Sequence, residues 1–389
     1  MVATTADGVP LKAKLRRAER ISRLRAYGLV LPLFAFIFVT FFMPIAVMLW
    51  RSVDNPLIAE HFPSTVAALA SWDPAEQPLP PEEAFAAAAS EMRAAAEARE
   101  IGRVATRINY EASGTRSLFT KTGRKLRNMD EPAEGTWQAT FIDIDEDWGE
   151  TEVWAALKNY GGATTLGYFL AALDLRYGEE GDIVQQPEGR QIYVTVFWRT
   201  VWISGLVTLF CLLLGYPVAY LLATLPTGIS NLLMILVLLP FWTSLLVRTT
   251  AWVVVLQTEG VLNDLLILAG IIDDRIQLIF NRFGVIISMT HILLPFMILP
   301  IYSVMKTISP SYVRAAQSLG ATPWTAFWRV YFPQSLVGIG AGGLLVFILA
   351  LGYYITPALV GGPTDQMVSY FIADHTNRSL NWGLASAMK

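Results

Sequence analysis

The side chains best suited to chemistry in this 389-residue sequence are few and widely separated. The three histidines, His61, His291 and His375, lie far apart, and the single cysteine, Cys211, lies in an apolar run. Metal and redox sites need such residues at close, defined spacings, so we predict no metal site in this chain. The sequence also lacks the G-x-x-x-x-G-K-[S/T] loop that binds nucleotide phosphates. We therefore expect no enzyme activity and no cofactor in the chain itself.

Arg248 is the charged residue that lies well inside a long apolar segment. A charge within a membrane span marks a functional site by default. Two interpretations stay open: Arg248 lines a translocation path as a gate or helix-pairing residue, or its side chain snorkels to the outer membrane surface. Trp242, Tyr353 and Tyr354 are further path candidates because their rings could face a cation, although such aromatic residues more often serve packing. His291 is expected to be a satisfied polar residue between helices.

The elements that carry these residues are predicted to be membrane spans. Apolar residues make up 54% of the chain and charged residues 16%, whereas soluble domains carry about 25% charged residues. Residues 51–195 hold 24 acidic and 13 basic side chains, and the rest of the chain holds only 8 and 16. This distribution indicates a membrane protein with one large soluble insertion. No basic stripe interleaved with aromatic residues is present, so nucleic acid is not expected as a partner.

Five apolar segments are long enough to cross a lipid bilayer, which takes roughly 20 residues in a helix. The first, 26–50, is interpreted as an uncleaved signal anchor. The other four are predicted at 196–224, 231–257, 284–305 and 334–359. The tail from Leu380 to Lys389 resembles the opening of a sixth span, so we expect the sequence to be truncated there.

Basic residues orient these spans, because Lys and Arg are enriched on the cytoplasmic side. Seven of the first 25 residues are Lys or Arg, which places the N-terminus (1–25) in the cytoplasm. The segment after the fourth span carries Lys306, Arg314 and Arg329 without an acidic residue, which places it on the same side. Alternation then puts residues 51–195 outside.

The insertion 51–195 is predicted to be an α+β domain. Residues 82–110 are rich in Ala, Glu and Arg and indicate helix, and residues 135–145 alternate enough to indicate a strand or two. The acidic cluster in 143–152 lacks the spacing of a calcium-binding loop and is interpreted as a solvated face. No nucleophile, base and orienting group can be assembled here, which favours an interaction domain. The remainder, 196–389, is predicted to be an all-α membrane core.

Residues 309–333 carry the clearest pattern in this core. Ser309-Pro310 is a helix start, Gly320 is a helix stop, and Thr322-Pro323 repeats the start. Pro333 is expected to end the second helix or to kink the chain beyond it. The sequence therefore predicts a short helix, a glycine turn and a second short helix.

The side chains of this loop are suited to contact with another protein. Ala315 and Ala316 keep one surface thin, which lets a partner's backbone come close. Phe327, Val330 and Tyr331 give the second helix an apolar stripe that can pack beneath the spans. A compact elbow of this kind suits mechanical coupling to a cytoplasmic partner.

The spacing of Arg314-Ala315-Ala316, Gly320, Val330 and Phe332-Pro333 resembles the EAA loop of binding-protein-dependent ABC importer permeases. That pattern is Glu-Ala-Ala, three residues, Gly, nine residues, Ile, one residue, Leu-Pro, and every spacing matches. Arg314 replaces the family's glutamate, and two apolar positions are exchanged mildly. Further stretches resemble the spermidine/putrescine branch of these permeases, namely 239–252, 259–263, 294–300 and 354–363. The resemblance covers the first span and about 192–389, but not 51–195.

The resemblance implies a type I ABC importer permease fold with six transmembrane helices, the sixth cut short here. It implies a multi-pass protein of the bacterial inner (cytoplasmic) membrane that transports polyamines or a related small solute. The implied partners are a second permease subunit, a cytoplasmic ABC ATPase dimer holding ATP and Mg, and a periplasmic substrate-binding protein. The implied ATPase-coupling residues are Arg314, Ala315, Ala316, Gly320, Phe327, Val330 and Pro333.

Two other classes stay open from the sequence. A membrane-anchored receptor or assembly protein would act through the acidic external domain and use its helices only as anchors. A secondary transporter is less favoured because the spans lack the paired carboxylates used in proton coupling. Co-purification of an ATPase would separate the importer permease from both.

Overall fold

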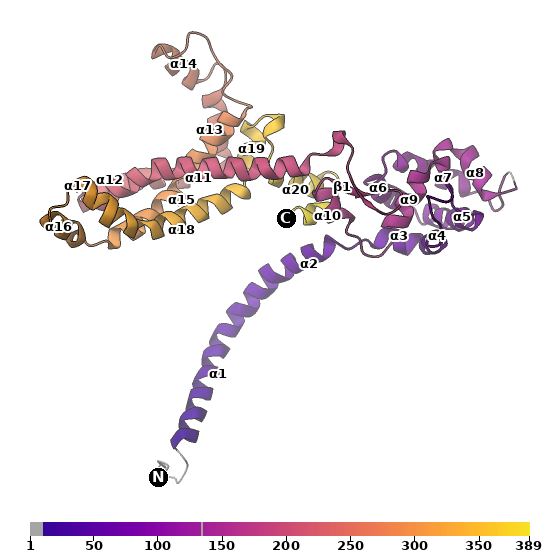
Figure 1. The fold of residues 1–389 in the computed structure, drawn as a ribbon, viewed down its shortest axis with the longest axis horizontal. Coiled ribbons are helices and arrows are strands. Elements are labelled where there is room, and N and C mark those ends of the chain that lie inside the picture. Colours follow the sequence, from indigo (N-terminus) through magenta and orange to yellow (C-terminus); the bar gives the residue numbers. More distant parts are fainter. Residues whose placement is uncertain (1–10, 134) are drawn as a thin grey trace. The chain divides into compact units, whose positions relative to one another are not determined.

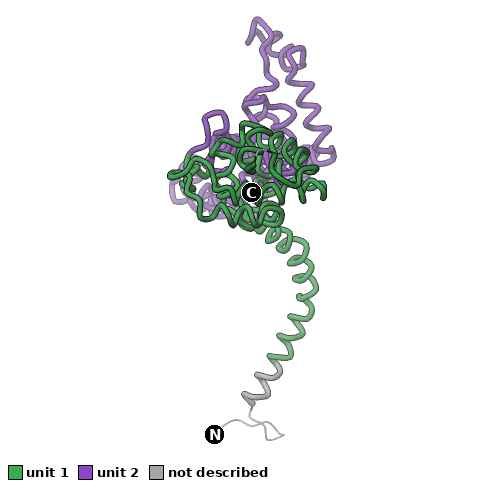
Figure 2. The backbone as a smooth tube through the Cα atoms, turned by 90° about the vertical axis from the view of Figure 1, so that its right-hand side faces the viewer, with its two compact units in different colours: residues 1–170, 176–184, 382–387 green, residues 171–175, 185–381, 388–389 purple. Residues whose placement is uncertain are grey.

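The computed structural model describes residues 11–133 and 135–389, so the first ten residues of the predicted cytoplasmic N-terminus lie outside the described residues. The chain divides into two compact units (Figure 2). Unit 1 comprises residues 1–170, 176–184 and 382–387, and unit 2 comprises residues 171–175, 185–381 and 388–389.

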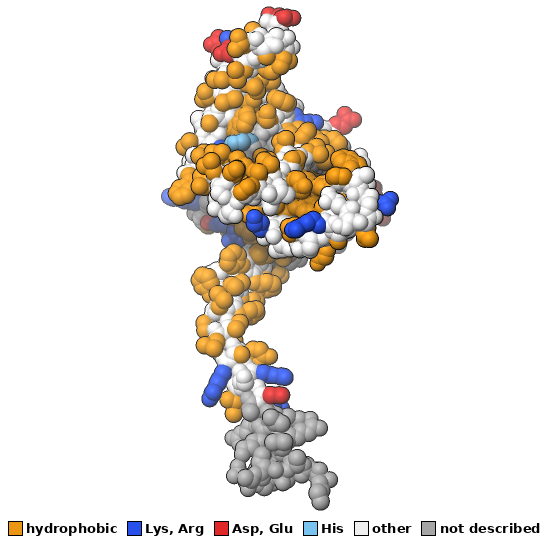
Figure 3. All heavy atoms as spheres, turned by 90° about the vertical axis from the view of Figure 1, so that its left-hand side faces the viewer, with side chains coloured by type: hydrophobic (Ala, Val, Ile, Leu, Met, Phe, Trp, Pro, Cys, Tyr) orange, Lys and Arg blue, Asp and Glu red, His pale blue; other side chains and the backbone are white. Residues whose placement is uncertain are grey.

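Unit 1 opens with a single long helix built from α1 (Leu11–Ile37), a π-helical turn η1 (Phe38–Phe42) and α2 (Met43–Arg51) (Figure 1). The part suited to a membrane, Glu19–Arg51, is 33 residues long, and none of its most apolar window is buried. Figure 3 shows hydrophobic side chains over most of this helix, with Lys and Arg gathered near its N-terminal end. The predicted span 26–50 thus lies within a longer helix whose apolar surface suits lipid.

The rest of unit 1 is a domain of short helices. They are α3 (Pro56–His61), α4 (Pro63–Leu69), α5 (Glu82–Glu97), α6 (Ile101–Asn109), α7 (Thr115–Leu126), α8 (Trp137–Ile144), the 3₁₀ turn η2 (Glu146–Gly149) and α9 (Thr151–Tyr160). The chain continues through α10 (Gly167–Ala172) and the paired strands β1 (Leu175–Tyr177) and β2 (Ile183–Gln185), each of which has one end in unit 2. The 3₁₀ turn η3 (Glu188–Arg190) that follows belongs to unit 2. Helix α21 (Trp382–Ala387) also belongs to unit 1.

The prediction of a strand in 135–145 was wrong, because this segment forms helix α8. Thr136 caps the helix by accepting a hydrogen bond from the backbone N–H of Ala139 at 3.3 Å. Thr140, Phe141 and Ile144 are buried, which is the i, i+1, i+4 spacing of one helical face. The insertion is therefore a helical domain with one small two-stranded sheet.

Large aromatic side chains form the core of this domain. The ring of Trp154 lies 4.3 Å from that of Phe85 and 5.2 Å from that of Trp148. Both indoles satisfy their N–H groups: Trp148 donates to Thr122 at 2.8 Å, and Trp154 donates to the carbonyl of Trp148 at 3.0 Å. Paired donors remove the cost of burying a polar group, so these residues contribute their full hydrophobic stabilisation.

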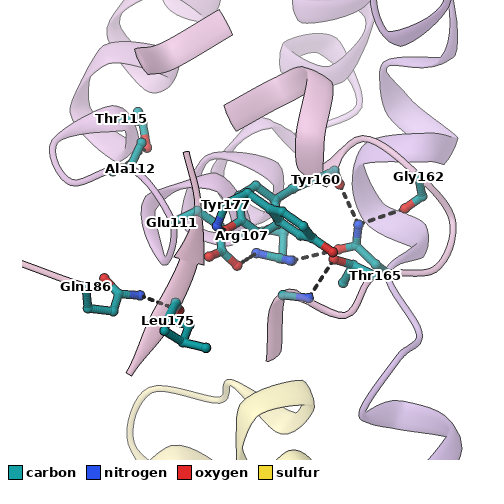
Figure 4. Close-up of polar contacts among 12 residues, drawn as sticks. Arg107, Glu111, Ala112, Thr115, Tyr160, Gly162, Thr165, Leu175, Tyr177 and Gln186 are labelled. Carbon is teal, nitrogen blue, oxygen red and sulfur yellow. Dashed lines mark hydrogen bonds and ion pairs between the residues drawn. The ribbon is translucent and has the colours of Figure 1, made fainter. Parts of the chain in front are cut away.

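Arg107 makes the main buried polar contact of the domain (Figure 4). Its side chain is 4% exposed and forms an ion pair with Glu111, which is 7% exposed, at 2.7 Å. The Nε–H of Arg107 donates to Oδ1 of Asn55 at 2.7 Å, and the Asn55 amide donates to the carbonyls of Tyr160 and Gly162 at 2.6 and 2.8 Å. This network ties the start of the domain to the loop after α9.

Unit 2 is helical and holds the apolar segments of the core. Its elements are α11 (Tyr193–Thr224), α12 (Thr227–Leu238), the 3₁₀ turn η4 (Leu239–Trp242), α13 (Leu245–Leu256), α14 (Val261–Leu268), α15 (Arg282–Thr307), α16 (Pro310–Ser318), α17 (Pro323–Ala326), the π-helical turn η5 (Phe327–Tyr331), α18 (Phe332–Leu351), α19 (Ile355–Val360), the 3₁₀ turn η6 (Pro363–Asp365) and α20 (Val368–Asn377). Helices α11, α15 and α18 lie side by side (Figure 1).

Four helices among the described residues are long and apolar enough to cross a membrane, or five if a bent pair counts as one span. The bent pair is Thr227–Trp242 with Leu245–Leu256, which meet at 96°. The predicted continuous span 231–257 is therefore broken in the middle. The predicted span 334–359 also differs, because α18 ends at Leu351 and α19 is a separate short helix. The sixth span stays a prediction.

Helix α11 begins at Tyr193, three residues before the predicted start, because a buried carboxylate caps it. Asp174 accepts hydrogen bonds from the backbone N–H groups of Ile192, Tyr193 and Val194 at 3.0, 2.9 and 2.9 Å. A helix N-terminus leaves several N–H groups without partners and carries partial positive charge, so an anion there is stabilising.

Glycines allow α18 to pack closely on α15. A Cβ on Gly338 would lie 3.0 Å from the Cα of Ile301, and one on Gly342 would lie 3.0 Å from the carbonyl oxygen of Met297. Nothing lies within 4 Å of the corresponding positions on Gly340 and Gly343. The i, i+4 pair of Gly338 and Gly342 therefore forms the small-residue seam of this helix pair.

Candidate coupling loop and translocation path

The predicted helix starts in the loop 309–333 are present. Ser309 caps α16 by accepting from the N–H of Ser311 at 3.4 Å, and Pro310 occupies the first turn. Thr322 caps α17 by accepting from the N–H of Thr325 at 3.2 Å, with Pro323 in the first turn. Each start thus combines an oxygen that satisfies a free N–H with a proline that has none to satisfy.

Gly320 ends α16 in a Schellman turn. The N–H of Ala321 donates to the carbonyl of Ala316 at 3.1 Å, and the N–H of Gly320 donates to that of Gln317 at 3.0 Å. Gly320 has a φ of +88°, which favours glycine, while nothing lies within 4 Å of where its Cβ would be. The backbone conformation, and not a lack of space within this chain, therefore selects glycine here.

The second helix of the loop was predicted to be a separate short helix. In the structure it continues through η5 into α18. Pro333 lies in the first turn of α18 and does not end the helix. The N–H of Phe332 donates to the carbonyl of Phe327, five residues back, so a widened turn precedes the proline. This widening relieves the clash between a helical proline ring and the carbonyl four residues back. The same arrangement occurs in the first span, where η1 precedes Met43 and Pro44.

The apolar side of this helix packs against α11. The ring of Phe327 lies 5.7 Å from that of Tyr220 and 6.3 Å from that of Tyr216. Tyr331 is buried and lies 5.3 Å from Tyr220, and the Tyr216 hydroxyl shares a 3.1 Å hydrogen bond with Ser335. Sequence analysis missed Tyr216 and Tyr220 because they lie in an unbroken apolar run that gives no sign of facing the loop.

The other side of the loop is open. Arg314 and Ala315 are exposed, and Ala316 and Val330 are half-buried. Among the described residues no carboxylate forms an ion pair with Arg314. Large apolar side chains are exposed next to them, with Leu319 89% and Trp324 72% exposed. An exposed apolar surface on a rigid, capped turn is typical of a protein-contact site.

Arg248 lies at the break between α12 and α13. Its guanidinium donates to the carbonyls of Pro240 and Thr243, the second at 3.1 Å. The carbonyl of Pro240 also accepts hydrogen bonds from the backbone N–H and the hydroxyl of Thr243 at 3.2 and 2.9 Å, so Arg248 adds a further donor to the turn that ends η4. Thr249 links the same helix to α19 through a 3.1 Å contact with the hydroxyl of Thr356.

The remaining path candidates are spread around this break. Trp242 is 89% exposed at the end of η4. Tyr353 follows α18 and is half-buried. Tyr354 is 42% exposed, and its ring lies 6.3 Å from that of Tyr370. Among the described residues, no hydrogen bond or ring contact joins these candidates to one another or to Arg248.

The membrane core of this chain is similar to known transport proteins. The family described as the inner membrane component of binding-protein-dependent transport systems matches residues 202–387. The spermidine/putrescine transport system permease protein PotB of Haemophilus influenzae is 38% identical over 197 residues, which are 51% of this chain and 69% of PotB. PotB of Escherichia coli is 36% identical over 196 residues, 50% of this chain and 71% of PotB. The inner membrane ABC transporter permease protein YdcU of Escherichia coli is 31% identical over 193 residues, 46% of this chain and 59% of YdcU.

Among solved structures, a bacterial alginate ABC transporter in complex with an alginate pentasaccharide-bound periplasmic protein has a chain that is 21% identical, with a TM-score of 0.43. That match covers 51% of this chain and 72% of the other.

The family match includes the loop 309–333, the broken span and α15. Identity above 30% over more than two thirds of PotB agrees with it. The chain is a multi-pass, non-catalytic transport subunit, and it belongs to the inner-membrane permeases of binding-protein-dependent ABC importers.

Proposed function

We propose that this chain is the permease subunit of an importer for polyamines, spermidine or putrescine, or a related small solute. The observation that carries the proposal is the 36–38% identity to PotB over the core. The Arg, Ala and Gly residues of the open loop face would contact a separate ATPase dimer, and the ATP and Mg would be bound by that partner. A second permease subunit would complete the path.

Movement of the loop would reach the spans through the aromatic contacts of Phe327. Closure of the ATPase dimer would push on 309–333, and the rigid Schellman turn at Gly320 would transmit the push without bending. Phe327 would pass it to Tyr220 and so to α11. The path would then open on the opposite side of the membrane, near Arg248.

The topology proposed has the N-terminus in the cytoplasm and the insertion 51–195 in the periplasm. The supporting observation is the cluster of exposed Arg20, Arg23 and Arg25 at the start of the first span. We propose that the insertion contacts the substrate-binding protein.

A co-purification experiment tests the importer assignment. A tagged full-length chain should bring down an ABC ATPase and a second permease from membranes, and the complex should hydrolyse ATP faster with binding protein and spermidine present. A chain that purifies alone from its native membranes would favour the receptor class instead.

The insertion can be removed at a defined place. The N–H of Asn55 donates to the carbonyl of Ala163 at 2.9 Å, so the two ends of the domain meet there. Deleting residues 56–162 and joining the ends with a short Gly-Ser linker should preserve membrane insertion and weaken binding-protein affinity. Undiminished affinity would refute the docking role.

A further inference from the structure

Trp252 on α13 and His291 on α15 form a polar pair beside Arg248. The indole N–H of Trp252 donates to Nδ1 of His291 at 3.1 Å, and the two rings lie 5.4 Å apart. An indole can only donate, so Nδ1 is the acceptor and the neutral ring carries its proton on Nε2. Trp252 lies four residues after Arg248 on α13, so the two residues share one face of that helix. Within the described part of the chain, no group accepts a hydrogen bond from Nε2.

His291 lies deep in its span and is exposed. It is nine residues after the start of α15, or about 14 Å along the helix axis. A polar ring with a free donor is costly against lipid, and so is the half-buried charge of Arg248. This face of α13 and α15 must therefore meet protein or water, and not acyl chains.

The backbone nearby favours water. The chain is irregular at the break around Thr243, and irregular backbone at membrane depth is tolerated only where protein buries it or where it lines a water-filled cavity. Thr243 and its neighbour Trp242 are both exposed in this chain.

We propose that Trp252 and His291 line the translocation path, an assignment that rests on the proposed permease function. The apolar spans of unit 2 contain no Asp or Glu between 193 and 256 or between 282 and 351. A cationic solute that passes along these spans would therefore contact aromatic ring faces and no acidic side chain. Such a surface lets a cation pass without holding it tightly, which leaves selection to the binding protein.

Cysteine accessibility tests this assignment without reference to any solute. Cys211 is buried and is the single cysteine, so Cys211→Ala gives a clean background. His291→Cys in that background should react with a membrane-impermeant methanethiosulfonate ammonium reagent in sealed vesicles of one or the other orientation. Leu213→Cys, at a 58% exposed apolar position on α11, is the matched control and should stay unreactive.

Three outcomes are informative. Labelling of His291→Cys that blocks uptake supports the path, and labelling with no polyamine uptake in the unlabelled parent supports the path while rejecting the solute. An unreactive His291→Cys in an assembled complex overturns the proposal, and Trp252→Cys takes its place if that variant fails to assemble. Trp252→Phe should keep uptake within about twofold, and Trp252→Leu should lower it about tenfold, the ratio for a cation–π contact of roughly 1.4 kcal/mol.

Discussion

The ring of Phe327 in the loop 309–333 lies 5.7 Å from the ring of Tyr220 on α11, at an interplanar angle of 88°. Edge-to-face pairs of this kind are worth about 0.5–1.5 kcal/mol beyond their hydrophobic burial. The contact gives the loop a direct mechanical connection to a span that the loop does not itself continue. Loop and span should therefore move together.

Breaking this pair should uncouple ATP hydrolysis from transport. Phe327→Ala and Tyr220→Ala should each lower uptake about 2- to 10-fold, the factor for 0.5–1.5 kcal/mol, while the ATPase stays active. Uptake and ATP hydrolysis measured on the same proteoliposomes check this. Tyr220→Phe keeps the ring and serves as the control, and additive losses in the double variant would argue against a shared contact.

Two substitutions at Gly320 distinguish the effect of the shape of the turn from the effect of a charge placed there. Asn and Asp both tolerate positive φ better than other side chains, so Gly320→Asn and Gly320→Asp should both keep the turn and insert into the membrane. Gly320→Asn should retain most uptake. Gly320→Asp should abolish it by placing a charge where we propose that the ATPase docks. Uptake at the wild-type rate by Gly320→Asp would contradict the coupling role.

The adjacent residues Gly342 and Gly343 of α18 provide a matched pair of substitutions, because only Gly342 belongs to the small-residue seam. Gly342→Ala should lower the thermal stability of the detergent-solubilised protein, because the new Cβ would lie 3.0 Å from the carbonyl oxygen of Met297. Gly343→Ala meets nothing within 4 Å and should stabilise the helix by up to about 1 kcal/mol. Equal effects at the two positions would show that α18 does not pack on α15 through Gly342.

Arg107 and Glu111 should depend on each other in the insertion. Arg107→Met removes the charged partner of the buried Glu111 carboxylate and should cost about 3–5 kcal/mol of unfolding free energy. Arg107→Met with Glu111→Leu removes both charges and should recover most of that loss. Urea unfolding followed by tryptophan fluorescence of the full chain measures both, and equal losses in the single and double variants would refute a buried pair.

The helix caps and the glycine turn of the loop 309–333 were predicted correctly, because they depend on interactions between residues close together in the sequence. Ser309, Thr322 and Gly320 each act on backbone groups within a few residues, so their roles follow from the sequence alone. Of the two expectations for Pro333, the end of the helix was wrong, because a π turn five residues long precedes the proline and lets the helix continue. The local sequence gives no signal for that turn.

Contacts between residues far apart in the chain could not be predicted from the sequence. Tyr220 faces the loop only because α11 and α18 pack together. Arg248 can be recognised in the sequence as an intramembrane charge, but its hydrogen-bond partners cannot. They are carbonyls at a helix break, and the sequence around that break was interpreted as one continuous apolar segment. The strand predicted in 135–145 failed for a related reason, since helical burial of Phe141 and Ile144 overrides local alternation.

Uptake of labelled spermidine and putrescine tests the central claim most directly. The cells to compare carry the full-length gene, its deletion, or the Gly320→Asp variant, with the membrane level of each chain matched by immunoblot. The account predicts ATP-dependent uptake with the wild-type chain and background uptake with the other two. Equal polyamine uptake in all three strains would contradict the proposed solute and the role of the coupling loop in its import.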